Sequence, residues 1–266
     1  MTSCATVGGT TKTGRRHSRG SCARGARVDR ANGVPGQRFP LPTSGRIVTD
    51  AAPVDARRAL HSVPGEGYAY QITTVKPHEG RFAQMGSAPN LEGGLITLCT
   101  CKHFMRAGRD VDRWPGQWIA GFTSVGRDGW DKHYLVYVMR VEHAFASHAE
   151  LWAWLQEKGV ESSKAADQNT YGDVYRPVDP EGDAHAWRNY HPPSEGHPHC
   201  KPQDWHRDIW DETAELWRRR PSALLVGDPR LSFVWDRPMV YLPGKLARTK
   251  RFTLDSLLAD LCEVEP

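Results

Sequence analysis

Residues 117–142 read QWIAGFTSVGRDGWDKHYLVYVMRVE, and this stretch sets the class of fold that we expect. It contains two apolar runs, 117–124 and 134–142, that are rich in β-branched and aromatic residues. Between the runs, the pair Asp128-Gly129 supplies the positive φ that a tight turn requires. The pattern predicts an antiparallel hairpin and points away from the parallel sheet of a Rossmann fold.

Further strands and helices are predicted on both sides of this hairpin. Four runs have the same β-type character: 68–76, 94–101, 223–226 and 231–235. One helix is predicted at 148–158, where Ser147 and Glu150 form a capping box and Gly159 ends the helix, and another from near Asp204 to Arg219. A C-terminal helix is amphipathic through Leu254, Leu257, Leu258 and Leu261. Residues 65–266 are therefore expected to form one α+β domain with mostly antiparallel strands and a few peripheral helices.

Residues 1–64 differ from the rest in charge and composition. The chain of 266 residues carries 35 Lys and Arg against 31 Asp and Glu, a net charge of +4. Eleven of the basic and three of the acidic residues lie in 1–64, so the remainder is net acidic. Because this segment is rich in Gly, Arg, Ser and Pro and has no apolar periodicity, we predict a disordered tail. Its scattered arginines could also form an arm that seeks nucleic acid, and an upstream start codon would give the same composition.

The sequence gives no indication of a membrane or an export pathway. No run approaches about 18 apolar residues, and the N-terminal charges are not followed by an apolar segment. We therefore expect a cytoplasmic protein without membrane contact. Six cysteines without a regular framework, in a chain of this length, favour reduced thiols over a disulfide scaffold.

Residues 97–106, TLCTCKHFMR, form the segment richest in chemically active side chains. On a strand, Cys99, Cys101 and His103 would share one face, although alternate positions lie about 6.6 Å apart, which is long for one tetrahedral zinc ion. The cysteines are small buried residues, metal ligands or a reactive thiol, and the sequence leaves these alternatives open. Lys102 and Arg106 are suited to bind a phosphate.

A long loop over residues 167–202 is rich in Pro, Gly and His, and loops of this length are often functional. Five of the twelve histidines lie within His185–His206, which makes zinc an alternative here as well. The segment 169–175 combines amide, carboxylate and phenol groups that suit the edge and the face of a base. Most of the ten tryptophans are expected in the core, with one or two available for base stacking.

The chain resembles the nucleotide modification associated domain 2 family. The resemblance covers roughly residues 66–245 in sequence order. Its motifs are Ala88-Pro89-Asn90, Thr97-Leu98 with Cys101-Lys102 and Arg106, 116–121 (GQWIAG), 135–141 (LVYVMRV), 172–175 (GDVY), a later histidine, and 223–226 (ALLV) before an aromatic strand. In this chain Thr100 separates two cysteines that are more often adjacent in the family, and His103 stands where a proline is usual.

The resemblance implies a small domain associated with DNA or nucleotide modification systems of bacteria and phages. The order of strands and turn also looks like the PUA-like pseudo-barrels, including EVE and ASCH domains, which bind modified bases or RNA in a cleft. The leading hypothesis is therefore a PUA-like α+β domain that binds a nucleotide or DNA containing a modified base. Other proteins of a modification or defence operon are possible partners, and neither a cofactor nor a resident metal is predicted.

This hypothesis assigns a role to particular side chains. Lys102 and Arg106 would hold phosphate, Asn90 and Asp173 would read the base, and Tyr175 or Trp118 would stack on it. The predicted nucleotide-binding residues are Asn90, Cys101, Lys102, Arg106, Trp118, Asp173, Tyr175 and His197. The joint change Lys102→Ala with Arg106→Ala is expected to abolish binding without lowering the melting temperature.

Two other classes of function remain as alternatives. The first is an enzyme that acts on a nucleotide or nucleobase through Cys101 or through zinc held by cysteine and histidine. The second is an interaction module whose 167–202 loop docks a partner protein, without affinity for nucleotides.

Overall fold

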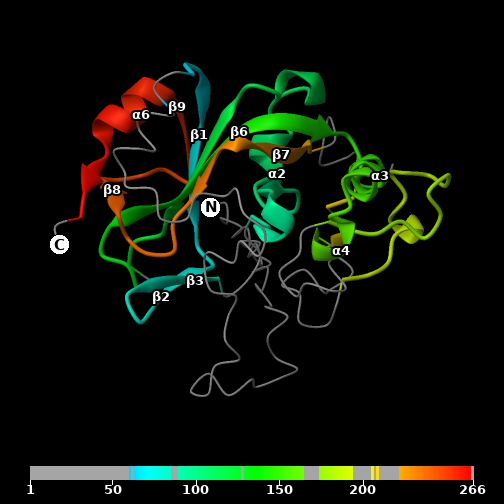
Figure 1. Cartoon of the computed structure of the whole chain (residues 1–266), viewed down its shortest axis with the longest axis horizontal. Coiled ribbons are helices and arrows are strands. Elements are labelled where there is room, and N and C mark those ends of the chain that lie inside the picture. The colour runs from blue at the N-terminus through cyan, green and yellow to red at the C-terminus, as the bar shows by residue number, and fades with distance from the viewer. Residues whose placement is uncertain are drawn as a thin grey trace, which may run out of the picture.

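The computed structural model describes residues 60, 63–84, 89–126, 129–164, 174–193, 205, 206, 208, 209 and 222–264. Within them, eight strands form one curled sheet that has the outline of half a barrel (Figure 1). These strands are β1 (Glu66–Ile72), β4 (Thr97–Leu98), β5 (Trp118–Thr123), β6 (His133–Phe145), β7 (Leu224–Val234), β8 (Val240–Leu242), β9 (Thr249–Thr253) and β10 (Cys262–Glu263). A separate hairpin consists of β2 (Val75–His78) and β3 (Arg81–Gln84).

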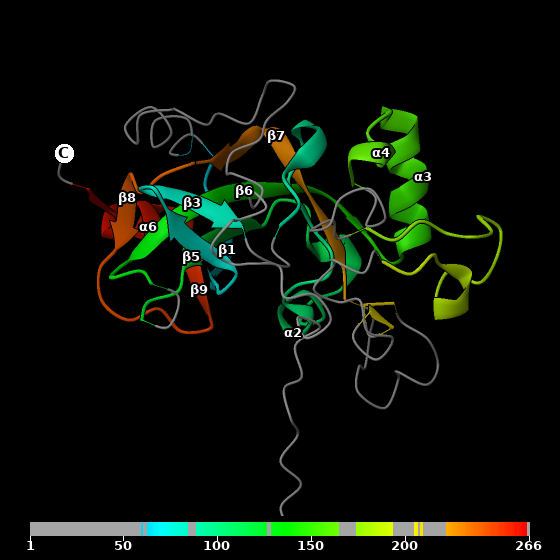
Figure 2. The same cartoon turned by 90° about the horizontal axis from the view of Figure 1, so that it is seen from below.

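Helices lie at both ends of the sheet and beneath its middle (Figures 1 and 2). α6 (Leu254–Asp260) stands at the end that holds β8 and β9, whereas α3 (His148–Lys158) and α4 (Glu161–Lys164) lie side by side at the other end. The remaining short helices are α2 (His103–Arg106) and the 3-10 turns η2 (Glu92–Gly94), η3 (Val111–Arg113) and η4 (Trp187–Asn189).

The strand order along the sheet is β9-β1-β5-β6, and the far edge of β6 is shared by two strands. β8 pairs with His133 and Tyr134, and β7 pairs with the longer part of β6 that follows. The predicted hairpin is confirmed, because β5 and β6 pair antiparallel. The sheet is nevertheless mixed, so the expected mostly antiparallel arrangement is not quite right: β1 runs parallel to β5.

The parallel pair is possible because residues 73–117 form a crossover between the two strands, and parallel strands require such a connection. It also depends on Gly67, which lies opposite Trp118 in the register. A Cβ atom at Gly67 would lie 2.1 Å from the Trp118 carbonyl oxygen, so no other residue fits this close backbone approach.

Two of the predicted strand boundaries are corrected by the structure. The run 68–76 is divided by a turn at residues 73–74 into β1 and β2. The runs 223–226 and 231–235 belong instead to the single strand β7, which contains an irregularity opposite Val141. There Asp228 accepts the Arg230 main-chain N–H at 2.9 Å, and Ser232 Oγ donates to the Asp228 carbonyl at 2.6 Å. These bonds satisfy the polar groups of the bulged segment, so the strand continues through it.

The predicted helices 148–158 and 254–261 are confirmed with small differences. Ser147 accepts the Glu150 N–H at the start of α3, the Glu150 carboxylate accepts the Ala146 N–H, and Gly159 ends the helix at φ +68°. Leu254, Leu257 and Leu258 of α6 are buried against the sheet. The helix predicted from near Asp204 to Arg219 lies mostly outside the described residues. None of the described helices is long and apolar enough to span a membrane.

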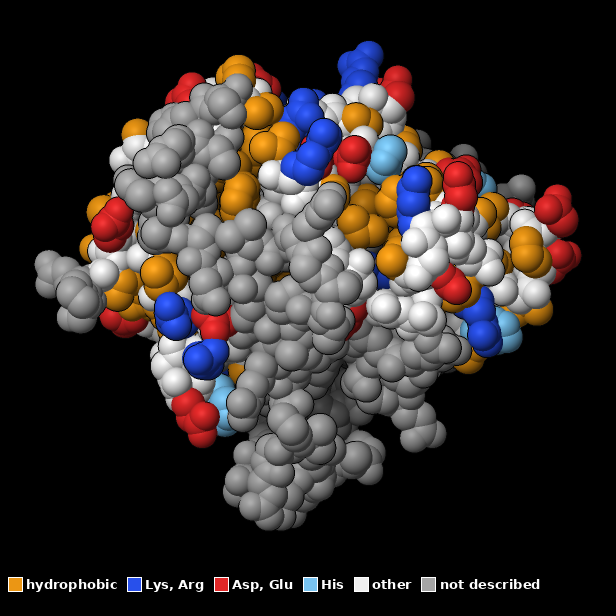
Figure 3. Space-filling model, in the orientation of Figure 1, with side chains coloured by type: hydrophobic (Ala, Val, Ile, Leu, Met, Phe, Trp, Pro, Cys, Tyr) orange, Lys and Arg blue, Asp and Glu red, His pale blue; other side chains and the backbone are white. Residues whose placement is uncertain are grey.

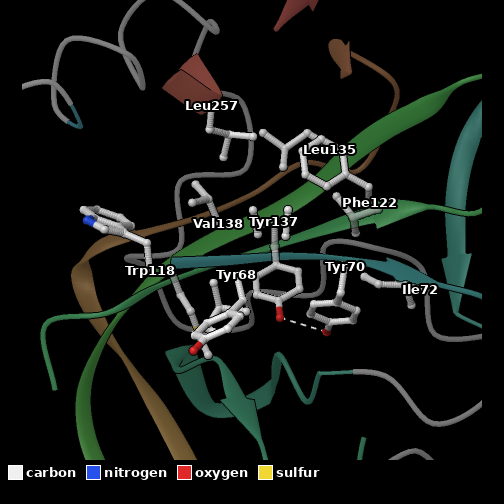
Figure 4. Packing of buried hydrophobic residues seen from close by; sticks show 14 of the residues in the cluster. Tyr68, Tyr70, Ile72, Trp118, Phe122, Leu135, Tyr137, Val138 and Leu257 are labelled. Carbon is white, nitrogen blue, oxygen red and sulfur yellow. Dashed lines mark hydrogen bonds between the residues drawn. The ribbon is translucent and has the colours of Figure 1, made fainter. Parts of the chain in front are cut away.

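Both faces of the sheet are packed (Figure 4). Trp118 and Val138 lie on one face together with Leu257 of α6, and Tyr68, Tyr70 and Tyr137 point to the other face. Tyr70 and Tyr137 are the register partners of Gly121 on either side, and their hydroxyl groups form a hydrogen bond of 2.9 Å. A Cβ atom at Gly121 would lie 2.3 Å from the Tyr137 ring. Glycine therefore lets the two tyrosine rings approach each other across β5, and the tyrosines form one wall of the site described below.

Candidate functional site

The segment 97–106 departs from the extended strand that would bring its cysteines and His103 onto one face. β4 ends at Leu98, residues 99–101 are bends, and His103 is the first residue of α2. Cys99 is buried with the side chains that pack between α3 and β7, whereas Cys101 is half-buried. Because the alternation of a strand is absent, Cys99, Cys101 and His103 do not form the convergent ligand set considered from the sequence.

Arg106 is fully buried, and its guanidinium group binds main-chain carbonyl groups. Nε donates to the Cys101 carbonyl at 2.7 Å, and Nη1 donates to the carbonyls of Ala223 at 2.7 Å and Ser222 at 3.3 Å. These bonds connect the 101–106 turn to the start of β7. We therefore reassign Arg106 from a phosphate ligand to a structural residue, because a fully buried side chain cannot meet a phosphate in solvent.

Lys102 remains a candidate for anion binding. Its backbone is in the left-handed region, with φ +61°, which costs a residue other than glycine roughly 1 kcal/mol. Nζ donates to the Arg248 carbonyl at 3.2 Å and lies 4.8 Å from the centre of the Tyr70 ring. Burial lowers the pKa of Lys102, the Cys101 thiolate opposes this effect, and Arg248 adds to it. A strained backbone at a half-buried cation is a pattern typical of functional sites.

Asn90 is buried, and its polar groups are used inside the protein. Its Oδ1 atom accepts the Glu92 N–H at 2.9 Å and a bond of 3.3 Å from the Lys164 ammonium group, which also donates to the Leu95 carbonyl. The Asn90 main-chain carbonyl receives a further bond of 2.9 Å from the same ammonium group. Asn90 thus ties α4 to the start of the 90–98 segment, and this role replaces the predicted reading of a base.

The two predicted stacking residues are also buried. Trp118 is fully enclosed on the face of the sheet opposite Tyr68, and Tyr175 is fully enclosed with its hydroxyl group on Asp208 at 2.9 Å. Neither ring offers a face to a base in this structure. Asp173 and His197 lie outside the described residues.

A network around Asp208 is the first site that the sequence did not indicate. The Asp208 carboxylate, whose side chain is inaccessible to solvent, accepts a hydrogen bond from Tyr175 and is also hydrogen-bonded to the imidazole ring of His103 in α2. The Tyr175 main-chain N–H donates to Nδ1 of His148 at 3.2 Å. The network therefore joins α2, the start of α3 and the 174–193 loop.

Burial lowers the pKa of His148 to about 3, and the Asp208 carboxylate offsets this effect only in part. The imidazole ring is consequently neutral at pH 7, with its proton on Nε2. His148 and Asp208 both line a cavity of about 10 Å³, together with His185 and Ser222. This volume holds about one water molecule and no substrate, so the Asp208 network is structural in this conformation.

A second pocket, which we call the arginine pocket, is large enough for a ligand. It has a volume of about 340 Å³ and is lined by Gly108, Arg109, Asp110, Arg113 and Arg251. The guanidinium group of Arg109 lies 5.9 Å from the Tyr68 ring and 5.7 Å from the Trp114 ring, and that of Arg251 lies 5.7 Å from the Tyr68 ring. Residues 108–113 and β9 therefore bring cations to the same tyrosine.

Lys102 belongs to the same part of the surface as the arginine pocket. Tyr68 and Tyr70 are two positions apart on β1 and point to the same face, so the Lys102 ammonium over Tyr70 neighbours the arginines over Tyr68. Phe104 of α2, two positions after Lys102, is 89% exposed and is the most exposed large hydrophobic residue among those described. On the face of the molecule drawn in Figure 3, Lys and Arg side chains lie next to hydrophobic side chains near the top of the view.

The sequence carried a weak signal for the arginine pocket. Arg109, Arg113 and Arg251 are ordinary surface cations by composition, and nothing in their spacing relates β9 to residues 108–113. The exposed Phe104 and the left-handed Lys102 lie within the 97–106 segment that the sequence singled out.

No group of three His, Cys, Asp or Glu side chains in the part of the chain that the structure covers is placed to hold a metal ion.

Comparisons of the chain with protein-family models, with curated proteins and with solved structures find no match.

Proposed function

We propose that this protein binds a nucleotide, or a nucleic acid segment that carries a modified base, through the arginine pocket and the adjoining Lys102. The observation that carries the proposal is the convergence of Arg109 and Arg251 on the ring of Tyr68. Guanidinium groups bind phosphate oxygens in a bidentate geometry. Aromatic rings that hold the arginine side chains in place reduce the side-chain entropy that is lost when a ligand binds.

Charge and aromatic exposure support this assignment over a general basic surface. Three arginines and one aspartate line the pocket, and Asp110 is 3.9 Å from Arg113. The exposed ring of Phe104 is suited to stack on a base, a contact worth about 1–3 kcal/mol. Phosphate contacts from the pocket and stacking from Phe104 are the two components of single-strand recognition.

The curled, half-barrel sheet is compatible with the PUA-like architecture that the sequence resembles, and we include that architecture in the proposal. The association with a DNA-modification system and with other proteins of such an operon rests on the resemblance. Under this proposal the phosphate role passes from Arg106 to Arg109 and Arg251, while Lys102 keeps the role predicted from the sequence.

The test is a binding experiment on the full chain with a double variant, Arg109→Gln with Arg251→Gln. The matched control is Arg188→Gln with Arg237→Gln, which removes two exposed arginines outside the pocket. Nucleotides and single-stranded oligonucleotides, plain and with modified bases, are titrated at two salt concentrations. We expect the pocket variant to lose at least about tenfold in affinity and the control to lose less than about twofold. Equal losses in both variants would refute the assignment.

A second candidate function is favoured by one observation. Cys101 and Lys102 are neighbours in the chain; burial lowers the pKa of Lys102, and the charge of a Cys101 thiolate opposes this effect. A thiolate paired with an ammonium group is the arrangement of a cysteine nucleophile, as an enzyme acting on a nucleotide would need. If iodoacetamide alkylates Cys101 no faster in the wild-type chain than in Lys102→Gln, this candidate is excluded.

A further inference from the structure

We propose that the arginine pocket recognises a phosphomonoester, the terminal phosphate of a nucleotide, in preference to the phosphodiester of a continuous strand. This inference rests on the proposed function and specifies which phosphate the site takes. The ligand can be a free mononucleotide or the phosphorylated end of a strand, since both present the same group.

The charge of the lining favours a doubly charged group. Arg109, Arg113 and Arg251 supply three positive charges, and Asp110 is the one carboxylate among the described lining residues. The resulting local charge of +2 matches a phosphomonoester, which carries about −1.5 to −2 at pH 7, whereas a diester carries −1. A monoester thus matches the charge of the lining, whereas a diester leaves one positive charge uncompensated.

Arg109 and Arg251 both lie near the Tyr68 ring before a ligand binds. Arg109 is half-buried against the rings of Tyr68 and Trp114, and its Nη1 donates to the Arg113 carbonyl at 3.2 Å. Arg251 lies on the other strand of the β1–β9 pair, directly opposite Tyr68 in the register. Because one ring positions two guanidinium groups that come from separate segments, they can converge on a single phosphate.

The size and the remaining polar group of the pocket fit one nucleotide end. A volume of about 340 Å³ lies within the range of pockets that hold small ligands. Asp110 is half-exposed and offers an acceptor for a sugar hydroxyl, so the site distinguishes a nucleotide from inorganic phosphate.

The test compares ligands that differ in the phosphate alone, with the full chain. The probes are a nucleoside 5′-monophosphate, the same nucleoside, a dinucleoside monophosphate that has an internal diester only, inorganic phosphate, and one oligonucleotide with and without a 5′-phosphate. We expect the monophosphate to bind at least about tenfold more tightly than the nucleoside or the diester. The oligonucleotide is expected to gain a similar factor from its 5′-phosphate, and inorganic phosphate is expected to bind more weakly than the nucleotide.

The pH dependence provides a second readout. The second ionisation of a phosphomonoester has a pKa of about 6, so affinity for the monophosphate should rise by at least about threefold between pH 5 and pH 7.5. The diester is singly charged throughout and should show no such rise. The arginines keep their charge over this range, and the described lining contains no histidine that would titrate with the ligand.

Variants separate this inference from the proposed function. Arg109→Gln should reduce the preference for monoester over diester, and Arg237→Gln, outside the pocket, should leave it unchanged. If monoester and diester bind with equal affinity and both lose it in Arg109→Gln, the pocket binds nucleic acid but the inference is wrong. If none of the probes binds, the proposed function fails together with the inference.

Discussion

Replacing His148 with asparagine tests whether the buried Asp208 network is held by a neutral histidine. His148 is 2% exposed at the first position of α3, where the helix dipole also disfavours a cation. Its Nδ1 atom accepts the Tyr175 N–H, and the Oδ1 atom of asparagine can accept the same bond. His148→Asn therefore removes the titrating group with limited damage to the network, at a cost of about 1–3 kcal/mol at pH 8.

The magnitude follows from the difference between two pKa values. The ordinary pKa of the histidine is 6.5, and burial lowers it to about 3 in the folded protein. Between these values the unfolded chain binds more protons, so the free energy of unfolding increases with pH and reaches its full value above 6.5. At pH 5 this one group makes the wild-type protein about 2 kcal/mol less stable than at pH 8. Asparagine does not titrate, so position 148 causes no such loss of stability in the variant.

The assay is urea unfolding of the full-length wild type and variant at pH 8 and pH 5, followed by tryptophan fluorescence. The stability advantage of the wild type over His148→Asn should shrink by about 2 kcal/mol on going from pH 8 to pH 5. The control is His78→Asn, which changes an exposed histidine of β2 and should leave the difference independent of pH.

A constant difference between wild type and His148→Asn would refute the reasoning. If the variant does not fold, the imidazole of the wild-type protein can be titrated by NMR instead. A His148 signal that protonates near pH 6.5 would show that the ring is not buried in a neutral form.

Three other substitutions test the roles that the structure assigns. Arg106→Gln should lower the free energy of unfolding by about 3 kcal/mol or more, because buried carbonyl groups lose a charged donor. Thermal melting followed by circular dichroism measures the loss, with Arg237→Gln as the control. An unchanged melting temperature would mean that Arg106 is a surface ligand after all. Gly121→Ala should lower the free energy of unfolding by about 2 kcal/mol, since the added Cβ atom would overlap the buried Tyr137 ring. An unchanged free energy in urea unfolding would contradict the packing across β5. Asp208→Asn should cost about 1–3 kcal/mol, because the hydrogen bonds of the buried carboxylate with Tyr175 and His103 are weakened, and proteolysis near Asp208 should become faster. Unaltered stability and cleavage would mean that these hydrogen bonds do not hold this part of the chain.

Much of the local structure could be predicted from the sequence because it depends on neighbouring residues. The β5–β6 hairpin follows from two apolar runs and a glycine-containing turn, and α3 follows from Ser147, Glu150 and Gly159. The bends at residues 99–101 and the continuous β7 could not be predicted. Their conformations depend on long-range hydrogen bonds, such as those from Arg106 to β7, that compete successfully with local preference.

The candidate site was predicted only in part, for a related reason. The 97–106 segment that the sequence singles out contains Lys102, which keeps its predicted role in the proposed site. Arg106, Asn90 and Tyr175 are residues of types that often bind ligands. In the folded protein they are buried, and their polar atoms form hydrogen bonds with carbonyl groups, an ammonium group and a carboxylate of the protein itself. Residue type indicates which bonds a side chain can make, and the fold determines with which partner.

The sequence by itself determined the α+β class, the hairpin, the bounds of α3 and, to within a residue, those of α6, since periodicity, caps and turn residues act over a few positions. The tertiary structure alone decided which cations meet. Arg109 and Arg251 are separated by more than half of the chain, and they converge because β9 pairs with β1 and places Arg251 opposite Tyr68. Strand pairing between distant segments is a property of the whole sheet, so the arginine pocket becomes visible only when the chain is folded.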